Sequence, residues 1–435
     1  MFYEESILDN GVRIISERMD TVRSVAIGIW FKVGSRDELD GQYGLSHFME
    51  HMFFKGTDTR DALKLSQDFE SLGAEQNAFT SKEYTCYYAR IVDDKLPQAL
   101  ELLADMLMNS QFADSEITSE REVVIEEIAR AEDTPEESVF DSFSAAAWPG
   151  HELGRPIIGT RESVSAYWHA DCAAYLQGHY HAGNCLVVAC GNVDHQRLAG
   201  LCQEYLGGLP KKPAQTRRLE PLGQTPKRLE IVEKATEQAH LVYGLPGLAL
   251  GDDDRFAGAI LDAALGGGMS SRLFQEIREK RGLAYAVYAS TMSFQALGSF
   301  FVYVGTRPAN LEEAVGLIRI ELLRILEEGI TAEELARMQE YLIGNMVLGM
   351  ESTASRMMRL GRNAVSGVPL YSLDETIERY RSVTMADTQR VAERVLTGSP
   401  TLAVISPREA ATLEGVLSGL LEDQNKGARN DQGIV

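Results

Sequence analysis

Two histidines and a glutamate within residues 44–57 have the types and the spacing of a metal site. The stretch reads Gly-Leu-Ser-His-Phe-Met-Glu-His-Met-Phe-Phe-Lys-Gly-Thr, a pattern typical of a helix that stops at Gly56. Residues four apart project from one face of a helix, so His47 and His51 can bind one Zn²⁺. Glu50 lies beside this pair, where its carboxylate can accept a proton from a water on the metal. The chemistry would be metal-assisted hydrolysis.

The order of these residues is H-x-x-E-H, which is the H-E-x-x-H zincin pattern read backwards. The alternative is a coincidental helix with two surface histidines. A catalytic zinc usually has three protein ligands and one open position, so the metal interpretation requires a third ligand on another element.

A helix over residues 115–132 offers two acids for that role. Glu120 and Glu127 are seven residues apart and fall inside its apolar stripe. An acid on a core face is costly unless it is paired or binds a metal, so either of them is a candidate third ligand. Ordinary salt bridges for both are the alternative. The stripe consists of Ile117, Val123, Val124, Ile128 and Ala131.

Other candidate sites are weaker. His179 and His181 could share a strand face, but no acid or cysteine cluster accompanies them, and we expect surface histidines. Gly266–Gly268 lacks the Lys and Ser/Thr of a phosphate-binding loop. Cys185 and Cys190 flank an apolar strand and are expected in the core, and five cysteines without a C-x-x-C pair predict no disulfide framework.

The zinc motif followed by the acidic helix resembles the pitrilysin/insulinase family of zinc peptidases. The closest resemblance is to its mitochondrial-processing-peptidase-like branch, which has bacterial members of about this length. The resemblance implies one zinc ion per chain, held by His47, His51 and Glu127. It implies Glu50 as the general base and Glu120 as an acid that supports a histidine.

The same resemblance implies residues that contact substrate. The segment 73–80 is similar to the family's edge strand, on which Asn77 and Ala78 would bind the substrate backbone. In the second half, Arg278 and Tyr285 match positions that reach the substrate and the oxyanion, where a cation and a phenol suit developing negative charge. Judged from the residues alone, a solvated arginine and a core tyrosine are the alternative.

The chain is organised as two similar halves. Pro, Gly and basic residues concentrate over 207–227, and strands and helices recur in the same order on both sides. We expect a zinc domain over 1–210, a linker over 211–227, a metal-free domain over 228–422 and a polar tail over 423–435. The fold class is α+β, with a mostly antiparallel sheet in each domain and helices packed on one face. The resemblance implies that each domain forms half of a clam-like chamber.

Composition restricts the partners. The 435 residues are 44% hydrophobic and carry a net charge of −22, which argues against nucleic acid and against anionic membranes and favours cationic peptides. No apolar run is long enough to span a membrane, and the first residues lack the features of a signal peptide, so we expect a cytoplasmic protein. The resemblance implies a homodimer or a pair with a zinc-less relative.

The sequence therefore predicts a zinc-dependent endopeptidase that hydrolyses short or unfolded peptides. Two alternatives belong to other functional classes. One is a catalytically silent structural subunit of the same family. The other is a peptide-binding or chaperone-like partner that retains zinc for stability.

Overall fold

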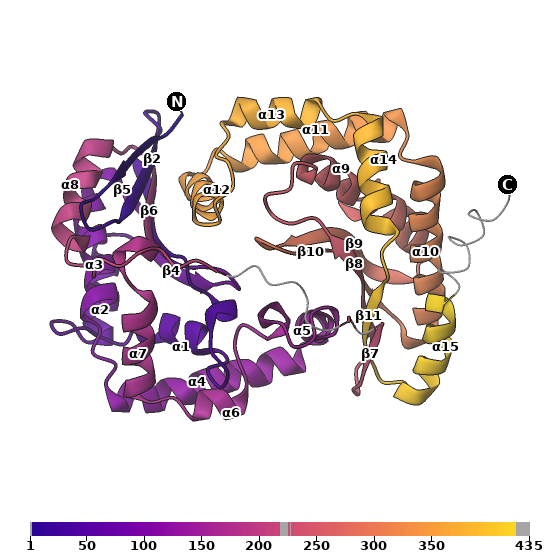
Figure 1. Ribbon diagram of the computed structural model, residues 1–435, viewed down its shortest axis with the longest axis horizontal. Helices are drawn as coiled ribbons and strands as arrows, with labels where there is room; N and C mark the ends of the chain where they lie inside the picture. Colours follow the sequence, from indigo (N-terminus) through magenta and orange to yellow (C-terminus); the bar gives the residue numbers. More distant parts are fainter. Residues whose placement is uncertain (1, 218–224, 227, 423–435) are drawn as a thin grey trace. The chain divides into compact units, whose positions relative to one another are not determined.

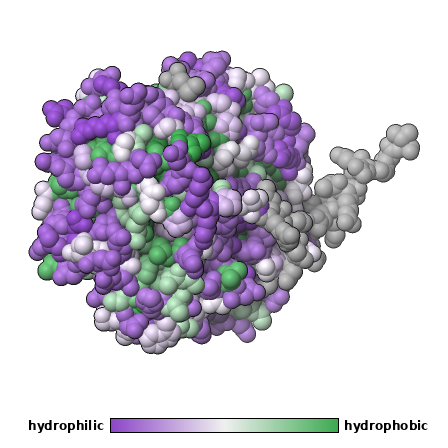
Figure 2. Space-filling model, turned by 60° about the vertical axis from the view of Figure 1, so that its left-hand side comes forward, coloured by the Kyte–Doolittle hydropathy of each residue, from purple (hydrophilic) through white to green (hydrophobic). Residues whose placement is uncertain are grey.

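The computed structural model describes residues 2–217, 225–226 and 228–422, and its chain forms two compact units (Figure 1). Unit 1 comprises residues 1–130, 155–218 and 347–372, and unit 2 comprises 131–154, 219–346 and 373–435. No helix among the described residues is long and apolar enough to cross a membrane. Figure 2 shows hydrophilic side chains over most of the face on view, with smaller apolar areas between them.

Unit 1 is built on a six-stranded sheet in the order β1-β2-β6-β3-β5-β4. Only the β2–β6 pair is parallel, so the sheet is mostly antiparallel, as predicted. β4 is at one edge, which leaves one of its sides without a neighbouring strand in this sheet. The strands are β1 (Glu4–Ile7), β2 (Arg13–Arg18), β3 (Ser24–Phe31), β4 (Glu75–Thr80), β5 (Thr85–Val92) and β6 (Cys185–Gly191).

Unit 2 repeats this sheet without a counterpart of β1. Its order is β7-β11-β8-β10-β9, and only β7–β11 is parallel. The other five strands of unit 1 each have a counterpart in unit 2, with β4 and β9 at equivalent edges. The strands are β7 (Leu229–Glu233), β8 (Ala239–Gly247), β9 (Ala284–Ser293), β10 (Gly298–Thr306) and β11 (Thr401–Ser406).

Along the chain, the α-helices alternate with the strands in a similar order in both halves. Those whose residues lie wholly or mainly in unit 1 are α1 (Leu45–Met52), α2 (Ala62–Ser71), α3 (Leu96–Asn109), α4 (Asp114–Asp133), α6 (Arg161–Ser165), α7 (His169–His179), α8 (His195–Leu206) and α12 (Thr353–Val365). Those of unit 2 are α5 (Pro135–Ala147), α9 (Arg255–Gly266), α10 (Leu311–Glu328), α11 (Ala332–Gly349), α13 (Leu373–Arg381), α14 (Met385–Leu396) and α15 (Ala410–Glu422).

The central strands of unit 1, which are β2, β3 and β6, bury both of their faces because their side chains alternate between two cores. Ile27 and Ile29 of β3 belong to the main core, whereas Ala26 and Trp30 belong to a smaller core that is shared with α12. A Cβ on Gly361 of α12 would lie 2.3 Å from the Trp30 ring, so glycine permits this close approach. Helices therefore lie on both faces of the sheet, in addition to the expected single layer.

Unit 2 covers its sheet in the equivalent way, with α5. Val139 and Phe143 of α5 pack on Val242 of β8 and Ile405 of β11. Each sheet thus carries a helix from the other half of the sequence, and the two units differ from the predicted ranges 1–210 and 228–422 at these two segments. No local pattern predicts the exchange, because an amphipathic helix does not encode which sheet it covers.

The first part of the predicted linker packs on unit 1. Arg217 makes a bidentate ion pair with Asp37, and the Gln215 backbone N–H donates to Asn184 Oδ1 at 2.7 Å. Most of the remaining predicted linker, and the predicted tail over 423–435, lie outside the described residues.

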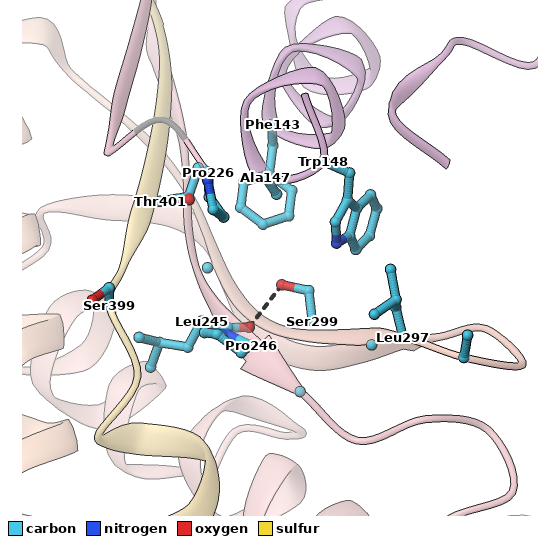
Figure 3. A pocket seen from close by; sticks show the side chains of 14 residues that line it. Phe143, Ala147, Trp148, Pro226, Leu245, Pro246, Leu297, Ser299, Ser399 and Thr401 are labelled. Carbon is cyan, nitrogen blue, oxygen red and sulfur yellow. Dashed lines mark hydrogen bonds between the residues drawn. The ribbon is translucent and has the colours of Figure 1, made fainter. Parts of the chain in front are cut away.

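Unit 2 contains an apolar cavity of about 160 Å³ between the end of α5 and the ends of β8 and β10 (Figure 3). Phe143 and Trp148 form one wall, and Leu245, Pro246 and Leu297 form part of the other. None of its lining residues is titratable, so this cavity has no group for acid–base or metal chemistry.

Candidate metal centre

The two histidines of α1 converge at their outer ring nitrogens. His47 Nε2 and His51 Nε2 are 3.3 Å apart, and their ring centroids are 4.6 Å apart. Two ligand atoms bound to a tetrahedral zinc at ~2.0–2.1 Å are separated by about 3.4 Å. One turn of helix therefore places these nitrogens at the separation that a shared zinc ion requires.

Glu127 of α4 completes the set. Its Oε2 lies 3.7 Å from His47 Nε2 and 3.6 Å from His51 Nε2. Within the described part of the chain, these three residues form the one group of three or more possible metal ligands whose donor atoms come this close together. The Glu127 side chain is 36% exposed, so solvent reaches the group. Three ligands with access for water are what a catalytic zinc needs.

The state of His47 also fits a metal. Burial, and then the neighbouring His51, lower the pKa of His47 to about 4, so its imidazole is neutral at neutral pH and offers a lone pair. We conclude from the donor atoms and their spacing that His47, His51 and Glu127 fit a zinc ion.

A buried acid orients the second imidazole. Glu120 is 3% exposed; its Oε1 is 2.8 Å from His51 Nδ1 and its Oε2 is 2.5 Å from Lys55 Nζ. Burial alone would raise the pKa of Glu120, but the hydrogen bonds to His51 and Lys55 outweigh it and lower that pKa. A carboxylate on Nδ1 leaves the His51 Nε2 lone pair directed at the other ligands.

Glu50 is held beside the ligands by the edge strand. Its Oε2 accepts a hydrogen bond of 2.6 Å from Thr80 Oγ1, at the end of β4. Burial raises the pKa of Glu50, while the Thr80 hydrogen bond and His51 act against that shift. A raised pKa brings a carboxylate closer to the range in which a general base works best near neutral pH.

β4 carries the residues expected to bind substrate. Asn77 is exposed and Ala78 half-buried, and the strand ends beside Glu50 at Thr80. The Ala78 N–H donates to Asn77 Oδ1 at 2.8 Å. An edge strand that leads to a candidate base is suited to pairing with an extended peptide.

Arg278 and Tyr285 belong to unit 2, where they contact each other. Arg278 lies in a π-helix over Phe274–Glu279, and its Nη1 donates to the Tyr285 carbonyl at 2.8 Å. Its guanidinium is 4.6 Å from the centroid of the Tyr285 ring. Tyr285 is 78% exposed rather than part of the core. Their predicted role at the oxyanion stays a prediction.

Two sequence expectations are wrong. Val123 is 42% exposed, because it lies at the flank of the α4 stripe, whose centre is formed by Ile117, Val124 and Ile128. His181 is buried at 4% exposure rather than on the surface. The segment after α8 packs beside it, where the Ala182 N–H donates to the Pro210 carbonyl.

The sequence analysis assigned no role to Lys55, Thr80 or Glu38. Of these, Glu38 binds the start of α1. Lys55 had a local signal, since it follows His47 and His51 at the same spacing of four. Thr80 and Glu38 reach the site only through tertiary contacts.

Two family models match the chain. "Insulinase (Peptidase family M16)" matches residues 13–161, and "Peptidase M16 inactive domain" matches residues 169–342. An uncharacterized zinc protease of Streptomyces coelicolor is 42% identical over 92% of this chain and 88% of its own length. An uncharacterized zinc protease of Bacillus subtilis is 39% identical over 92% of this chain and 97% of its own length.

Solved structures share the fold. A peptidase M16 inactive domain from Pseudomonas fluorescens matches with a TM-score of 0.87 at 22% identity, over 94% of this chain and 99% of that one. A protease from Helicobacter pylori matches with a TM-score of 0.84 at 23% identity, over 93% and 99%. The more specific assignment to the mitochondrial-processing-peptidase-like branch stays a prediction. On this similarity over nearly its whole length, the chain belongs to the insulinase family of peptidases, family M16.

Proposed function

We propose that this protein is a zinc-dependent endopeptidase. The observation that carries the proposal is the convergence of His47, His51 and Glu127 within 4.8 Å, with Glu50 beside them. The relatives named zinc proteases support it at the level of the family. One zinc ion per chain is part of the proposal.

The residues of the chain divide the work of hydrolysis. A bound zinc ion would polarise the scissile carbonyl and lower the pKa of water. Glu50 accepts the proton of the attacking water and then delivers it to the leaving amine, while Thr80 fixes its carboxylate. Glu120 and Lys55 hold the His51 ring so that its Nε2 keeps one direction.

The proposed substrate is a short or unfolded peptide in an extended conformation. It would add to the free side of β4, where its carbonyl oxygens compete with Asn77 for the Ala78 N–H. The net charge of −22 favours cationic peptides in the encounter. We also propose a cytoplasmic homodimer or a pair with a zinc-less relative, with no nucleic-acid or membrane partner.

The test compares two carboxylate variants. Glu50→Gln should keep one zinc per chain but cleave a basic, unfolded, internally quenched fluorescent peptide about 10²–10⁴-fold more slowly than wild type. Asp262→Asn, which changes a carboxyl on the equivalent helix α9 of unit 2, should cleave at the wild-type rate. A chelator should abolish cleavage by wild type.

Equal cleavage by wild type and Glu50→Gln would refute the proposal. A wild-type protein that holds zinc and binds the peptide without cleaving it would instead support the silent or peptide-binding alternative.

A further inference from the structure

The N-terminus of the zinc helix is held by one buried carboxylate. Glu38 is 4% exposed; its Oε2 accepts the Gly44 N–H at 2.9 Å and its Oε1 accepts the Ser46 N–H at 2.8 Å. The first N–H groups of a helix have no partner within the helix, and a carboxylate there is also favoured by the helix dipole. Both carboxyl oxygens of Glu38 thus accept hydrogen bonds from the turn that carries His47.

The turn that carries His47 and the backbone of Glu38 each make one further contact. Ser46 Oγ and Tyr175 Oη of α7 are 2.6 Å apart. Arg155 Nη1 donates to the Glu38 carbonyl at 3.1 Å. A Cβ on Gly44 would lie 2.5 Å from the Ile158 carbonyl oxygen, so the start of α1 has no room to shift in that direction.

The segment that ends at Glu38 also binds the loop that follows the edge strand. The Ser35 N–H donates to the Ser81 carbonyl at 3.1 Å, and the Arg36 N–H donates to the Lys82 carbonyl at 2.9 Å. Arg36 and Glu83 form an ion pair of 2.5 Å in which both side chains are 4% exposed. Residues 35–38 therefore join the start of α1 to the end of β4, which are the two elements that carry His47 and Thr80.

We propose that Glu38 is a positioning residue of the metal centre. It sets the height and rotation of α1 against β4, so that the imidazoles of His47 and His51 and the carboxylate of Glu50 keep their mutual geometry. The role of Glu38 toward His47 and His51 does not depend on the proposed peptidase function, whereas its role toward Glu50 rests on that function. Sites held 1 Å too loosely lose metal affinity and rate even when every ligand is present.

Burial and hydrogen bonding act in opposite directions on the carboxyl group of Glu38. Burial raises its pKa to about 7, while the hydrogen bonds from Ser46 and Gly44 and the charge of Arg155 act against the shift. The phenols of Tyr167 and Tyr175 also lie within its electrostatic reach. The backbone hydrogen bonds from Gly44 and Ser46 therefore offset part of the cost of burying this carboxyl group.

The experiment uses Glu38→Gln, whose amide can accept only one of the two N–H groups. The full-length protein is loaded with Co²⁺ alone, and its visible absorption reports the geometry around the ion. Zinc affinity is measured in competition with a chelating dye. The control is Glu321→Gln in α10 of unit 2, where the acid is equally buried at 3% exposure.

We expect Glu38→Gln to alter the cobalt spectrum and to weaken zinc binding about tenfold, with kcat reduced more than KM changes. The control should match wild type in all three. Should Glu38→Gln not fold, Glu38→Asp, which keeps the charge but shortens the side chain, should shift the spectrum in its place. A folded variant with the wild-type spectrum and zinc affinity would overturn the inference. If wild type binds cobalt but cleaves no peptide, the proposed function fails while the spectrum still decides the role of Glu38.

Discussion

Helices α1 and α9 occupy equivalent places in the two units but differ in chemistry. Each follows the central strand of its sheet (β3 or β8), and each packs beside the edge strand, β4 or β9. Each also directs an acid at a threonine of that strand, Glu50 at Thr80 and Asp262 at Thr291. The shared scaffold therefore positions a carboxyl group, and what unit 1 adds is a set of metal ligands.

The two helices also differ in how their first turns are held. α1 is bound by the buried Glu38, whereas the start of α9 uses Asp252 and Asp254, which pair with Arg394 and Arg390 of α14 at 2.5 and 2.6 Å. Both arginines are more than half exposed, and exposed ion pairs contribute about 0–1 kcal/mol. The start of α1, the helix of the candidate metal ligands, is thus bound by a buried carboxyl group, whereas the start of α9 is bound through solvent-exposed arginines.

The largest expected effect comes from making α1 resemble α9. His47→Ala should reduce bound zinc from one per chain to near zero and peptide cleavage to background, because two ligands bind zinc far more weakly than three. Elemental analysis after dialysis measures the metal. The control is His240→Ala on β8 of unit 2, which should keep its zinc. Full zinc in His47→Ala would mean that the metal binds elsewhere.

The next effect tests whether unit 2 contributes to the reaction. If Tyr285 and Arg278 stabilise the oxyanion, Tyr285→Phe and Arg278→Lys should each lower kcat about 10²-fold while zinc content is unchanged. Tyr341→Phe serves as a matched control, since Tyr341 is a partly exposed tyrosine of α11. Steady-state kinetics with one peptide substrate measure kcat for wild type, the two variants and the control. Wild-type kcat in both variants would remove these two residues from the mechanism.

A smaller effect is expected from the support of His51. Lys55→Met removes the cation that holds Glu120, which is the partner of His51, and should weaken zinc binding by no more than about tenfold, the lower end of the range typical for loss of a ligand's own partner. Lys64→Met on α2, where the lysine is exposed and pairs with Asp68, should leave the affinity unchanged. Competition with a chelating dye measures both. Equal affinities would show that Glu120 holds His51 without help from Lys55.

The smallest effect concerns stability in unit 2. Burial raises the pKa of Asp262 to about 7, from 3.8 for an unperturbed side chain. The folded state therefore binds the proton more tightly than the unfolded state, so this group lowers the free energy of unfolding as pH rises from about 4 to about 7. Asp262→Asn should remove that loss, and wild type should fall relative to the variant by ~1–3 kcal/mol between pH 5 and pH 8.

Urea unfolding at the two pH values measures this difference. Asp253→Asn, at an exposed acid just before α9, is the control and should follow wild type at both. Parallel pH dependence in wild type and Asp262→Asn would show that the carboxyl group of Asp262 is solvated.

Local periodicity predicted much of the fold and part of the site. The spacing of four between His47 and His51 was enough to pair their imidazoles on one helix face. The apolar stripe of α4 left Glu120 and Glu127 open as the third ligand, since both share its face. The structure separates them, with Glu127 near both Nε2 atoms and Glu120 on His51 Nδ1.

What the sequence could not predict depends on contacts between distant segments. The exchange of α5 and α12 follows from sheet surfaces that only exist once both units fold. Glu38 reads as one acid among the 64 Asp and Glu residues of the chain, and only its burial against Gly44 and Ser46 distinguishes it. Thr80 gains a role only because β4 ends beside Glu50.

The proposed function requires one divalent ion to bind between α1 and α4. X-ray absorption at the zinc edge of the purified, zinc-loaded protein tests it most directly, because the spectrum counts imidazole ligands and their distances. We expect zinc–nitrogen distances of ~2.0–2.1 Å to two imidazoles together with carboxylate oxygen, and the loss of an oxygen neighbour in Glu127→Gln. A spectrum with fewer than two imidazoles, or one that Glu127→Gln leaves unchanged, would contradict it.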